Sequence, residues 1–276
     1  MLKFKKYHGL GNDFIIIDTQ DEENNWSSIA KILCQRRFGV GADGLMTCTI
    51  RDGKPFMRIF NSDGSEAEMC GNGLRCFVHH LRRNNNFPGE EIDVHTGNGW
   101  LQARLLQEEG KKVRVANILG VPSFEPEKIP VSFAGNIFLE EKVKAEDREF
   151  SVSAVKTGPP HAVIFLEDLD QFPCDYWGPI LEKNQVFPRK ANINFTQILS
   201  PERARVIVWE RGVGLTQACG TGAAAVAVIG QQLGKLGKKP RIELPGGTLE
   251  IEWDGPETPV TMIGNSEFVF SGEADL

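Results

Sequence analysis

The residues of this chain that are best suited to chemistry are two cysteines, each at the start of the same four-residue pattern. Cys70–Gly73 reads Cys-Gly-Asn-Gly, Cys219–Gly222 reads Cys-Gly-Thr-Gly, and a stretch typical of a helix follows each. The glycines allow a tight turn and a close approach of the backbone to a ligand. Because the N–H groups at a helix start favour negative charge, we expect the pKa of both thiols to fall below about 8.5.

The two cysteines belong to halves of the chain that resemble each other. They lie 149 residues apart (219 − 70), and the same offset matches further glycines, strand-like segments and polar residues. The pairs are Gly71 with Gly220, Gly73 with Gly222, Gly97 with Gly246, 57–60 with 206–209, Asn12 with His161, Asp43 with Asn192, and Asn61 with Glu210. We interpret the pattern as a duplication. Duplicated halves usually pack about a pseudo-two-fold axis, which predicts that the two cysteines lie on opposite sides of one cleft.

Two thiols on opposite faces of one bound molecule suit the inversion of a carbon centre. One thiolate removes a proton from the carbon and the opposed thiol delivers a proton to the other face, which is general acid–base catalysis by two groups. If the carbon is next to a carboxylate, helix-start N–H groups stabilise the developing negative charge, and closure of the two halves excludes water. The sequence shows no pyridoxal lysine and no glycine-rich dinucleotide fingerprint, so we predict a reaction without a cofactor.

Short strands are expected to carry most of these residues. Strand-like segments lie in 3–18, on either side of a glycine-containing turn at 7–13, and near 45–48, 57–60, 91–95, 100–106 and 112–116. A proline-rich stretch with Pro122, Pro126 and Pro130 is the expected crossing between the halves.

Three helices are expected. Ser27 or Ser28 is predicted to cap a short helix through Leu33. Apolar residues after Cys70 have helical spacing up to Leu81, and the polar run 84–86 is the expected end of that helix. The segment Ala223–Ile229 is apolar all round, so its helix should be buried on every side.

Length and composition indicate a globular protein with room for two domains. The chain has 276 residues, 41% of them hydrophobic and 25% charged. A net charge of -6 without a basic block argues against nucleic acid as the main partner. No apolar run approaches the roughly 20 residues of a membrane helix, and the first six residues lack the features of a signal peptide. We therefore expect a cytosolic protein, or one in a compartment reached by a transit peptide that is absent from this sequence.

The six cysteines are more typical of thiols than of disulfides in such a chain. No Cys/His spacing indicates a zinc site, and we predict none. The nearest set, Cys70 with Cys76, His79 and His80, would lie along one helix without a second cluster.

Five segments together resemble the diaminopimelate epimerase family, and they follow in order along nearly the whole chain. They are 8–14 (His-Gly-Leu-Gly-Asn-Asp-Phe), 60–65 (Phe-Asn-Ser-Asp-Gly-Ser), 70–76 (Cys-Gly-Asn-Gly-Leu-Arg-Cys), 210–212 (Glu-Arg-Gly) and 216–223 (Thr-Gln-Ala-Cys-Gly-Thr-Gly-Ala). The resemblance implies interconversion of LL- and meso-2,6-diaminoheptanedioate without pyridoxal phosphate, on the route to lysine.

The resemblance also implies an architecture. It is an α+β fold of two pseudo-symmetric halves, each a mostly antiparallel sheet curled around a central helix. The halves are expected at 1–117, to which 264–276 return, and at 118–263, and the family is commonly homodimeric.

Carried over residue by residue, the resemblance assigns roles to the site. Cys70 and Cys219 become the acid–base pair, with Cys70 usually named the donor and Cys219 the acceptor, although the reaction runs both ways. His161 and Glu210 lie close enough to the thiols to influence their protonation. Helix-start contacts to the reacting carboxylate come from Gly71, Asn72, Gly220 and Thr221, and contacts to the amino and carboxylate groups come from Asn12, Asn61, Asn192, Glu210 and Arg211.

The chain departs from the family pattern at a few positions. Pro159 stands where the family generally has asparagine, and proline cannot form the same hydrogen bonds, so one contact to the distal end of the substrate is missing or replaced. Asn194 stands where glycine is common. We interpret Cys34, Cys48, Cys76 and Cys174 as packing residues and His8 as a structural support of its loop. The five tryptophans carry no motif and fit a core or an interface.

Other functions fit the same cysteines. A related cofactor-independent amino-acid racemase, such as a proline racemase, would keep both thiols but would not need Asn61, Asn192 and Arg211 for a second amino-acid group. A redox protein would switch a Cys70–Cys219 disulfide. A pure binding module would tolerate serine in place of both cysteines.

Overall fold

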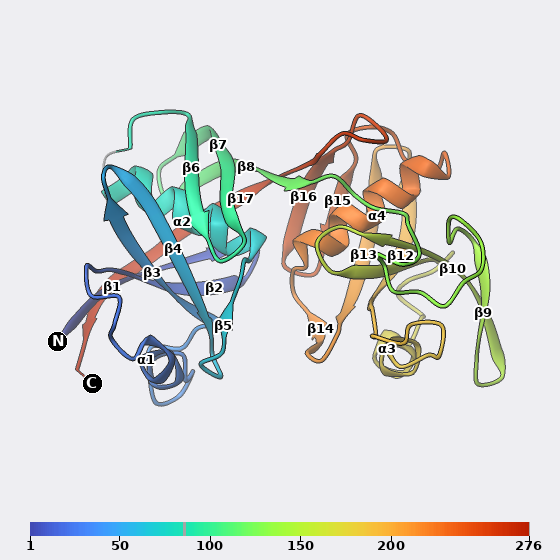
Figure 1. Ribbon diagram of the computed structural model, residues 1–276, viewed down its shortest axis with the longest axis horizontal. Helices are drawn as coiled ribbons and strands as arrows, with labels where there is room; N and C mark the ends of the chain where they lie inside the picture. Colours follow the sequence, from blue (N-terminus) through green and yellow to red (C-terminus); the bar gives the residue numbers. More distant parts are fainter. Residues whose placement is uncertain (85–86, 276) are drawn as a thin grey trace. The chain divides into compact units, whose positions relative to one another are not determined.

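The structure, a computed structural model, describes residues 1–84 and 87–275 and consists of two compact units (Figure 1). The first comprises Met1–Ile118 and Ile263–Leu276, and the second comprises Leu119–Met262. The chain thus leaves the first unit before the proline-rich stretch, which lies inside the second unit, where Ser123 pairs with Lys156. The expectation that this stretch forms the crossing was wrong. Instead, Ser123 exchanges two backbone hydrogen bonds with Lys156, which ties the stretch to the second unit.

The first unit is a mostly antiparallel sheet with helices on both faces (Figure 1). The elements are β1 (Leu2–Gly9), β2 (Asn12–Asp18), α1 (Trp26–Leu33), β3 (Gly44–Arg51), β4 (Lys54–Asn61), β5 (Glu66–Ala67), α2 (Gly71–Asn84), β6 (Glu91–Thr96), β7 (Gly99–Glu109), β8 (Lys112–Gly120) and β17 (Val260–Ala274). Two neighbouring pairs are parallel, β2 with β3 and β4 with β6. The other pairs are antiparallel: β1 with β2 and with β17, β3 with β4, β4 with β5, β6 with β7, and β7 with β8.

The second unit repeats this scheme after an added strand, β9. Strand β9 pairs with β10, β10 with β11, β11 runs parallel to β12, β12 pairs with β13, β13 pairs with β14 and runs parallel to β15, and β15 pairs with β16. The elements are β9 (Glu141–Ala145), β10 (Arg148–Lys156), β11 (Pro160–Phe165), α3 (Cys174–Glu182), β12 (Asn192–Ser200), β13 (Arg203–Glu210), β14 (Gly214–Thr216), α4 (Gly220–Gln232), β15 (Arg241–Leu244) and β16 (Gly247–Glu252).

The topology confirms the duplication that the sequence predicts. The order strand, strand, helix, three strands, helix, two strands occurs in both units with the same pairings. Helices α2 and α4 begin 149 residues apart (220 − 71). The pair Ile59 and Ala67 in β4–β5 also corresponds at this offset to the pair Val208 and Thr216 in β13–β14.

The strand segment Phe14–Ile17 is hydrophobic at every position because both of its faces are buried. Because side chains alternate along a strand, Phe14 and Ile16 pack in the core around α2, whereas Ile15 and Ile17 pack under α1. The core around α2 also draws side chains from β1, β3, β4, β6, β7 and β8. The sheet therefore curls around α2 and buries it.

Helix α4 is buried on every side, as its sequence predicts. All residues from Gly222 to Gly230 are buried. The helix contacts strands β10–β13, β15 and β16.

The first helix ends at Leu33 as predicted, but its predicted N-cap was wrong by two or three residues. Helix α1 is capped by Asn25, whose side chain accepts a hydrogen bond from the N–H of Ser28 at 3.1 Å. The hydroxyl of Ser27 instead donates to the carbonyl of Gly64 at 2.7 Å, tying α1 to the turn before β5. Helix α2 extends to Asn84, and residues 85 and 86 of the predicted polar end lie outside the described part of the chain.

The minor structural predictions agree with the packing. Cys34, Cys48, Cys76 and Cys174 are all buried thiols in hydrophobic cores. His8 supports its loop by accepting the N–H of Gly11 at Nδ1. Among the tryptophans, Trp26, Trp177 and Trp253 are buried and Trp209 is partly buried, so these four fit the predicted core, whereas Trp100 is exposed and does not.

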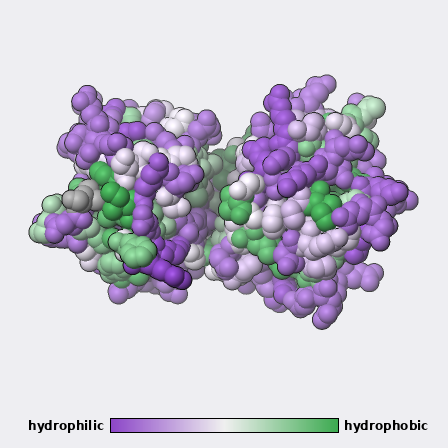
Figure 2. Space-filling view, turned by 90° about the horizontal axis from the view of Figure 1, so that it is seen from below, coloured by the Kyte–Doolittle hydropathy of each residue, from purple (hydrophilic) through white to green (hydrophobic). Residues whose placement is uncertain are grey.

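The face of the molecule in Figure 2 is mostly hydrophilic, with hydrophobic residues in small separate patches. Phe38, Val213 and Leu215 are among the exposed large hydrophobic side chains. Within residues 1–84 and 87–275, none of the helices combines the length and the hydropathy needed to cross a bilayer.

Replacing Phe77 with alanine should destabilise the protein strongly, because this fully buried ring lies at the centre of the α2 core. We expect a loss of about 3–5 kcal/mol in the free energy of unfolding. The control is Ile32→Ala, in the exposed part of α1, which should change it by less than about 1 kcal/mol. Urea unfolding followed by circular dichroism measures both, and equal losses would contradict this account of the core.

Candidate active site

Cys70 immediately precedes α2 and caps its first turn. Its carbonyl accepts the N–H of Leu74 at 2.8 Å, and its Sγ accepts the N–H of Gly73 at 3.4 Å. The sulfur is therefore held at the positive end of the helix. A Cβ on Gly73 would lie 3.3 Å from Cys70 Cβ and 3.4 Å from Ile59 and Met46, so glycine keeps this turn tight against the sheet.

Asn12, at the start of β2, connects the thiol of Cys70 to neighbouring polar groups. The Oδ1 atom of Asn12 lies 3.7 Å from Cys70 Sγ and accepts a hydrogen bond from Asn72 Nδ2 at 3.2 Å. The Nδ2 atom of Asn12 donates to Asp43 Oδ2 at 2.8 Å. Asp43 directly precedes β3, which is parallel to β2. Parallel pairing therefore brings Asn12 and Asp43 together beside the helix start.

A charged cluster fixes this corner of the first unit. Arg36 binds the carboxylates of both Asp13 and Asp43, and Lys6 binds Asp13 at 2.8 Å. Burial by itself raises the pKa of Asp13, but the hydrogen bonds and charges of Arg36 and Lys6 hold it at about 2. Two acids and two bases thus balance one another, and Asn12 keeps a fixed orientation toward the thiol.

Asn61 lies in an exposed turn at the end of β4. Its Nδ2 donates to Ser65 Oγ at 2.9 Å, and its carbonyl accepts the N–H of Gly64. These contacts are those of a turn-capping asparagine, so its predicted contact with the substrate stays a prediction.

Cys219 occupies the matching place at the start of α4. It is the N-cap residue, its carbonyl accepts the N–H of Ala223 at 3.0 Å, and it is only 5% exposed. The hydroxyl of Thr221 lies 3.6 Å from Cys219 Sγ. A Cβ on Gly222 would lie 3.3 Å from Cys219 Sγ and 2.6 Å from Asn194 Oδ1, so only glycine fits between them.

The expected lowering of the thiol pKa was wrong for Cys219. Burial raises its pKa well above the ordinary value, and the negative charge of Glu210 raises it further. Hydrogen bonds from Thr221 and from the N–H of Gly222 act in the opposite direction but are the weaker effects. Desolvation of the charged form therefore outweighs the helix N-terminus here.

His161 is fully buried at the start of β11 and is joined to Cys219 through Thr221. Its Nε2 lies 3.0 Å from Thr221 Oγ1 and 3.4 Å from Asn192 Nδ2, and its Nδ1 lies 3.2 Å from the side-chain amide of Asn194. Burial lowers the pKa of His161 to about 3, so the ring is neutral near neutral pH. A neutral imidazole offers one donor and one acceptor, as a group between a hydroxyl and an amide requires.

Glu210 is the last residue of β13 and acts on Cys219, and Arg211 follows it. The hydroxyl of Thr216 donates to Glu210 Oε1 at 2.5 Å. Burial raises the pKa of Glu210, while hydrogen bonds with Thr216 and Cys219 lower it. The N–H of Arg211 donates to Asn192 Oδ1 at 2.7 Å, and its guanidinium donates to the carbonyl of Arg189. Its backbone is thus tied to the site, while its side chain is exposed.

The structure therefore gathers most of the predicted residues into two clusters, one in each unit. Around Cys70 lie Gly71, Asn72 and Asn12, and around Cys219 lie Gly220, Thr221, His161, Asn192 and Glu210. Pro159 adjoins Pro160, the first residue of β11, and its carbonyl accepts the N–H of Thr157.

Sequence reasoning missed three residues that hold these clusters. Asn194 orients His161, Asn117 donates to the carbonyl of Gly71 at 2.8 Å, and Arg75 contacts both residues that follow Cys70. The sequence did indicate Arg75, as a charged residue within a helix face whose other residues are buried. Asn117 gave no signal, because its contact depends on how β8 packs against α2.

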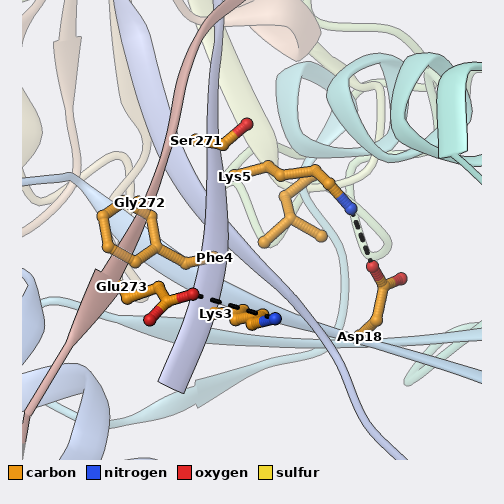
Figure 3. Close-up of a pocket in the computed structure, with 8 residues that line it drawn as sticks. Lys3, Phe4, Lys5, Asp18, Ser271, Gly272 and Glu273 are labelled. Atoms are coloured by element: carbon orange, nitrogen blue, oxygen red, sulfur yellow. Dashed lines mark hydrogen bonds and ion pairs between the residues drawn. The ribbon is translucent and has the colours of Figure 1, made fainter. Parts of the chain in front are cut away.

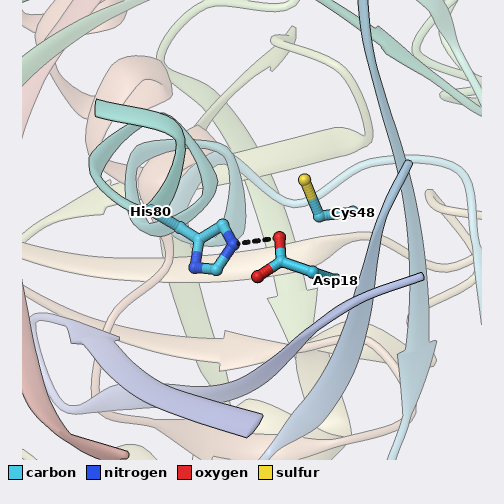
Figure 4. Close-up of side chains that lie close together, drawn as sticks. All are labelled: Asp18, Cys48 and His80. Carbon is cyan, nitrogen blue, oxygen red and sulfur yellow. Dashed lines mark hydrogen bonds and ion pairs between the residues drawn. The ribbon is translucent and has the colours of Figure 1, made fainter. Parts of the chain in front are cut away.

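One group of side chains outside these clusters has the donors that a metal ion uses. Atoms of Asp18, Cys48 and His80 all lie within 4.8 Å of one another (Figure 4). Asp18 Oδ1, however, is 2.7 Å from His80 Nε2, and its Oδ2 is 3.1 Å from Lys5 Nζ. Both oxygens are engaged by basic groups, so the arrangement is that of a partly buried ion-pair network.

A cavity of about 550 Å³ lies beside this network, between β1, β2 and β17 (Figure 3). Its lining residues are Lys3, Phe4, Lys5, Ile16, Asp18, Ser271, Gly272 and Glu273. Lys3 pairs with Glu273 across it, and Lys5 pairs with Asp18. None of the predicted site residues lines this cavity.

Comparison with known proteins gives a consistent family assignment. The family model "Diaminopimelate epimerase" matches residues 4–124 and 153–269. A protein named diaminopimelate epimerase from Carboxydothermus hydrogenoformans is 44% identical over 280 residues and covers 99% of both chains. The protein of that name from Moorella thermoacetica is 40% identical over 278 residues and covers 100% of both.

Solved structures with the same fold are more distant in sequence. A PhzF-family phenazine biosynthesis protein from Bacillus anthracis is 15% identical, with a TM-score of 0.72 over 100% of this chain and 99% of that one. A hydroxyproline epimerase from Agrobacterium vitis is 14% identical, with a TM-score of 0.70 over 98% of this chain and 91% of that one. These likenesses establish the α+β fold and, at such identity, nothing further.

The buried histidine makes the stability of the protein depend on pH. Unfolded His161 binds a proton below about pH 6.5, whereas folded His161 stays neutral down to about 3. Its contribution is therefore complete above pH 6.5 and is lost as the pH falls through this window, by up to about 1.4 kcal/mol per pH unit. We expect His161→Gln to flatten the pH dependence of urea unfolding between about pH 6 and 4.

His79 provides a matched comparison, because burial lowers its pKa to about 4. His79→Gln should flatten the same part of the curve, and the double variant should flatten it further. A pH dependence unchanged in His161→Gln would show that the folded ring titrates normally.

Proposed function

The chain belongs to the diaminopimelate epimerase family, and from this premise we propose that Cys70 and Cys219 are the two acid–base groups of its reaction. The protein is an isomerase that interconverts LL- and meso-2,6-diaminoheptanedioate in lysine biosynthesis. The single observation that carries the assignment is that each cysteine caps the start of a buried helix at equivalent positions of a duplicated unit.

In the proposed step, the substrate α-carbon lies between the two sulfurs. The thiolate of one cysteine accepts the α-proton, and the electron pair of the broken C–H bond moves into the adjacent carboxylate. The opposed thiol then donates its proton to the other face of the carbon, and the electron pair returns to form the new C–H bond. The protonation states of the two cysteines are exchanged at the end of the step, so reversal of the reaction uses the same groups.

The substrate carboxylate needs stabilisation because a carbon acid of this type is weak. The N–H groups of Gly71 and Asn72 in α2 and of Gly220 and Thr221 in α4 belong to first helical turns, and N–H groups at this end of a helix favour negative charge. We assign the reacting carboxylate to these groups. Fixed dipoles of this kind stabilise the charge that develops in the transition state.

The remaining predicted residues are assigned to substrate binding and to tuning of the thiols. Asn12, Asn61, Asn192, Glu210 and Arg211 bind the amino and carboxylate groups. His161 acts on Cys219 through the hydroxyl of Thr221, and Glu210 acts on the same thiol directly; their contacts in the second unit support this assignment. Pro159 removes one amide contact with the distal end of the substrate.

The relatives of about 40% identity weaken the alternative functions, because a redox protein or a binding module would not match this family over its whole length.

We also propose a cytoplasmic location and a homodimeric state. All six cysteines are free thiols, which suits a reducing compartment. Light scattering of the purified protein tests the dimer, and a monomer at micromolar concentration would exclude it.

Incubation of the protein with the LL isomer in D₂O tests the chemistry. We expect the meso product with deuterium at one α-carbon. Cys70→Ser and Cys219→Ser should each reduce turnover by at least about 10²-fold, because a serine hydroxyl is a poor acid and base at neutral pH.

Cys174→Ser is the matched control, since this thiol, at the first residue of α3, is buried in a hydrophobic core of the second unit that does not include Cys219. Its turnover should remain within about twofold of the wild type. Near-normal turnover in the Cys70→Ser, Cys219→Ser double variant would exclude two-thiol catalysis.

A further inference from the structure

The ring of His161 lies between two side-chain amides whose orientations are fixed by backbone groups. Asn194 Nδ2 lies 2.8 Å from the carbonyl of Ala162, and because a carbonyl only accepts, this atom of the amide is the donor. The same Nδ2 lies 3.2 Å from His161 Nδ1. Asn192 Oδ1 accepts the backbone N–H of Arg211 at 2.7 Å, so its Nδ2 is the atom that faces His161 Nε2, at 3.4 Å. Each ring nitrogen therefore faces an amide NH₂ group.

Asn194 keeps this orientation although its oxygen gains nothing from it. The residue is fully buried, and its Oδ1 is one of the few buried side-chain atoms without a hydrogen-bond partner in the described part of the chain. Turning the amide over would place Oδ1 against the carbonyl of Ala162, where two oxygens repel each other. A buried amide with an unpaired oxygen is costly, so its position calls for an explanation in terms of what its NH₂ group does.

These neighbours select one tautomer of His161. Burial lowers the pKa of His161 to about 3, so near neutral pH the ring carries one N–H and one lone pair. A proton on Nδ1 would point at the NH₂ group of Asn194, which is a donor. A proton on Nε2 has an acceptor in Thr221 Oγ1, 3.0 Å away. The lone pair is therefore on Nδ1, where it accepts from Asn194, and the proton is on Nε2.

The tautomer decides which way the hydroxyl of Thr221 points. Since Thr221 Oγ1 accepts the Nε2–H of His161, its own proton is left to donate to Cys219 Sγ, 3.6 Å away. With the proton on Nδ1 instead, Nε2 would accept and would draw the hydroxyl proton of Thr221 to the ring. Burial and the charge of Glu210 raise the pKa of Cys219, and the hydrogen bond of Thr221 lowers it. Negative charge on this sulfur thus gains a donor in only one tautomer of the histidine.

The first unit has the corresponding residues without a tautomer to fix. At the 149-residue offset, His161 corresponds to Asn12 and Asn194 corresponds to Leu45, which is fully buried. Asn12 has a fixed donor and a fixed acceptor atom, and its Nδ2 donates to Asp43 Oδ2 at 2.8 Å. An amide is thus present at this place of the repeat where a histidine has to be oriented, and an apolar side chain where it does not.

Building on the proposed function of Cys219, we propose that Asn194 fixes His161 in the Nε2–H tautomer and thereby makes Thr221 a hydrogen-bond donor to the thiolate form of Cys219. Asn194 acts through two other side chains, so it is a positioning residue. The same tautomer places an N–H opposite the amide of Asn192, which leaves this NH₂ group to bind the substrate.

The tautomer is measured directly by long-range proton–nitrogen correlation NMR of the wild-type protein carrying nitrogen-labelled histidine. Rings with the proton on Nε2 and rings with the proton on Nδ1 give different cross-peak patterns, and the signals of His161 are those missing from His161→Gln. We expect a proton on Nε2 and none on Nδ1 near neutral pH. A proton on Nδ1, or on both nitrogens, would overturn the proposal without any variant of Asn194 having to fold.

Asn194→Asp tests the role of the amide. A carboxyl group whose hydroxyl keeps the bond to the carbonyl of Ala162 presents its other oxygen to Nδ1, so we expect the ring proton to move to Nδ1. We expect kcat to fall about tenfold or more, because a hydrogen bond to a charged sulfur is lost. An Nε2–H ring or a near-normal kcat in folded Asn194→Asp would refute this role.

Gln197→Glu is the matched control. It makes the same change of amide to carboxyl group in the same strand, β12, at a side chain that also donates to a carbonyl, that of Glu167. It should leave the tautomer of His161 unchanged and kcat within about twofold of the wild type. A loss equal to that of Asn194→Asp would show that any carboxyl group in this strand disturbs the enzyme, and would overturn the proposal.

The route to the sulfur is tested by combining Asn194→Asp with Thr221→Val, which removes the hydroxyl group. Thr221→Val should lower kcat in the wild type but add less than about a twofold loss to Asn194→Asp, because the two changes remove the same hydrogen bond. Losses that multiply would show that Asn194 does not act through Thr221.

These outcomes are separable from those of the proposed function. If the ring proton lies on Nδ1 but the serine variants of Cys70 and Cys219 still lose deuterium incorporation, the two-thiol reaction stands and only the role of Asn194 is wrong. If the serine variants keep near-normal turnover, the two-thiol reaction itself fails, whatever the tautomer of His161.

Discussion

The structure depends on one constraint: in each unit, a cysteine caps a helix whose first turn lies at the edge of a buried core. The Cys-Gly-x-Gly sequence satisfies this constraint with a tight turn. Its second glycine is required, because a Cβ on Gly73 or Gly222 would press on the cysteine and on the sheet. The curled sheet then encloses the helix on all sides, so the sulfur is held by backbone N–H groups and by side chains at strand ends. The thiol is fixed without a flexible loop.

The duplication provides this cysteine-capped helix in both units, but the polar residues around the two cysteines differ. Asn12, Asn72 and Asp43 around Cys70 correspond to His161, Thr221 and Asn192 around Cys219, and the hydrogen bonds among them follow the same pattern. The charges differ, since Arg75 underlies one helix start and Glu210 adjoins the other.

Much of this could be predicted from the sequence. The repeated cysteine pattern and the fixed 149-residue offset predict the duplicated fold, because turns and helix starts are marked by local residue types. The cap of α1 and the fall in the pKa of Cys219 were mispredicted, since Asn25 competes with nearby serines and burial competes with the helix dipole. Asn117 and Asn194 act through contacts between distant segments, which no spacing along the chain reveals, whereas Arg75 bonds to two residues of its own helix.

The measurement that tests the central claim most directly is a crystal structure of the Cys70→Ser, Cys219→Ser double variant with the LL isomer of diaminoheptanedioate bound. The account predicts one α-carbon with a serine oxygen within about 3.5 Å on each of its two faces, and its carboxylate at the starts of α2 and α4. A substrate that contacts only one of these serines, or the two serines facing different pockets, would contradict it.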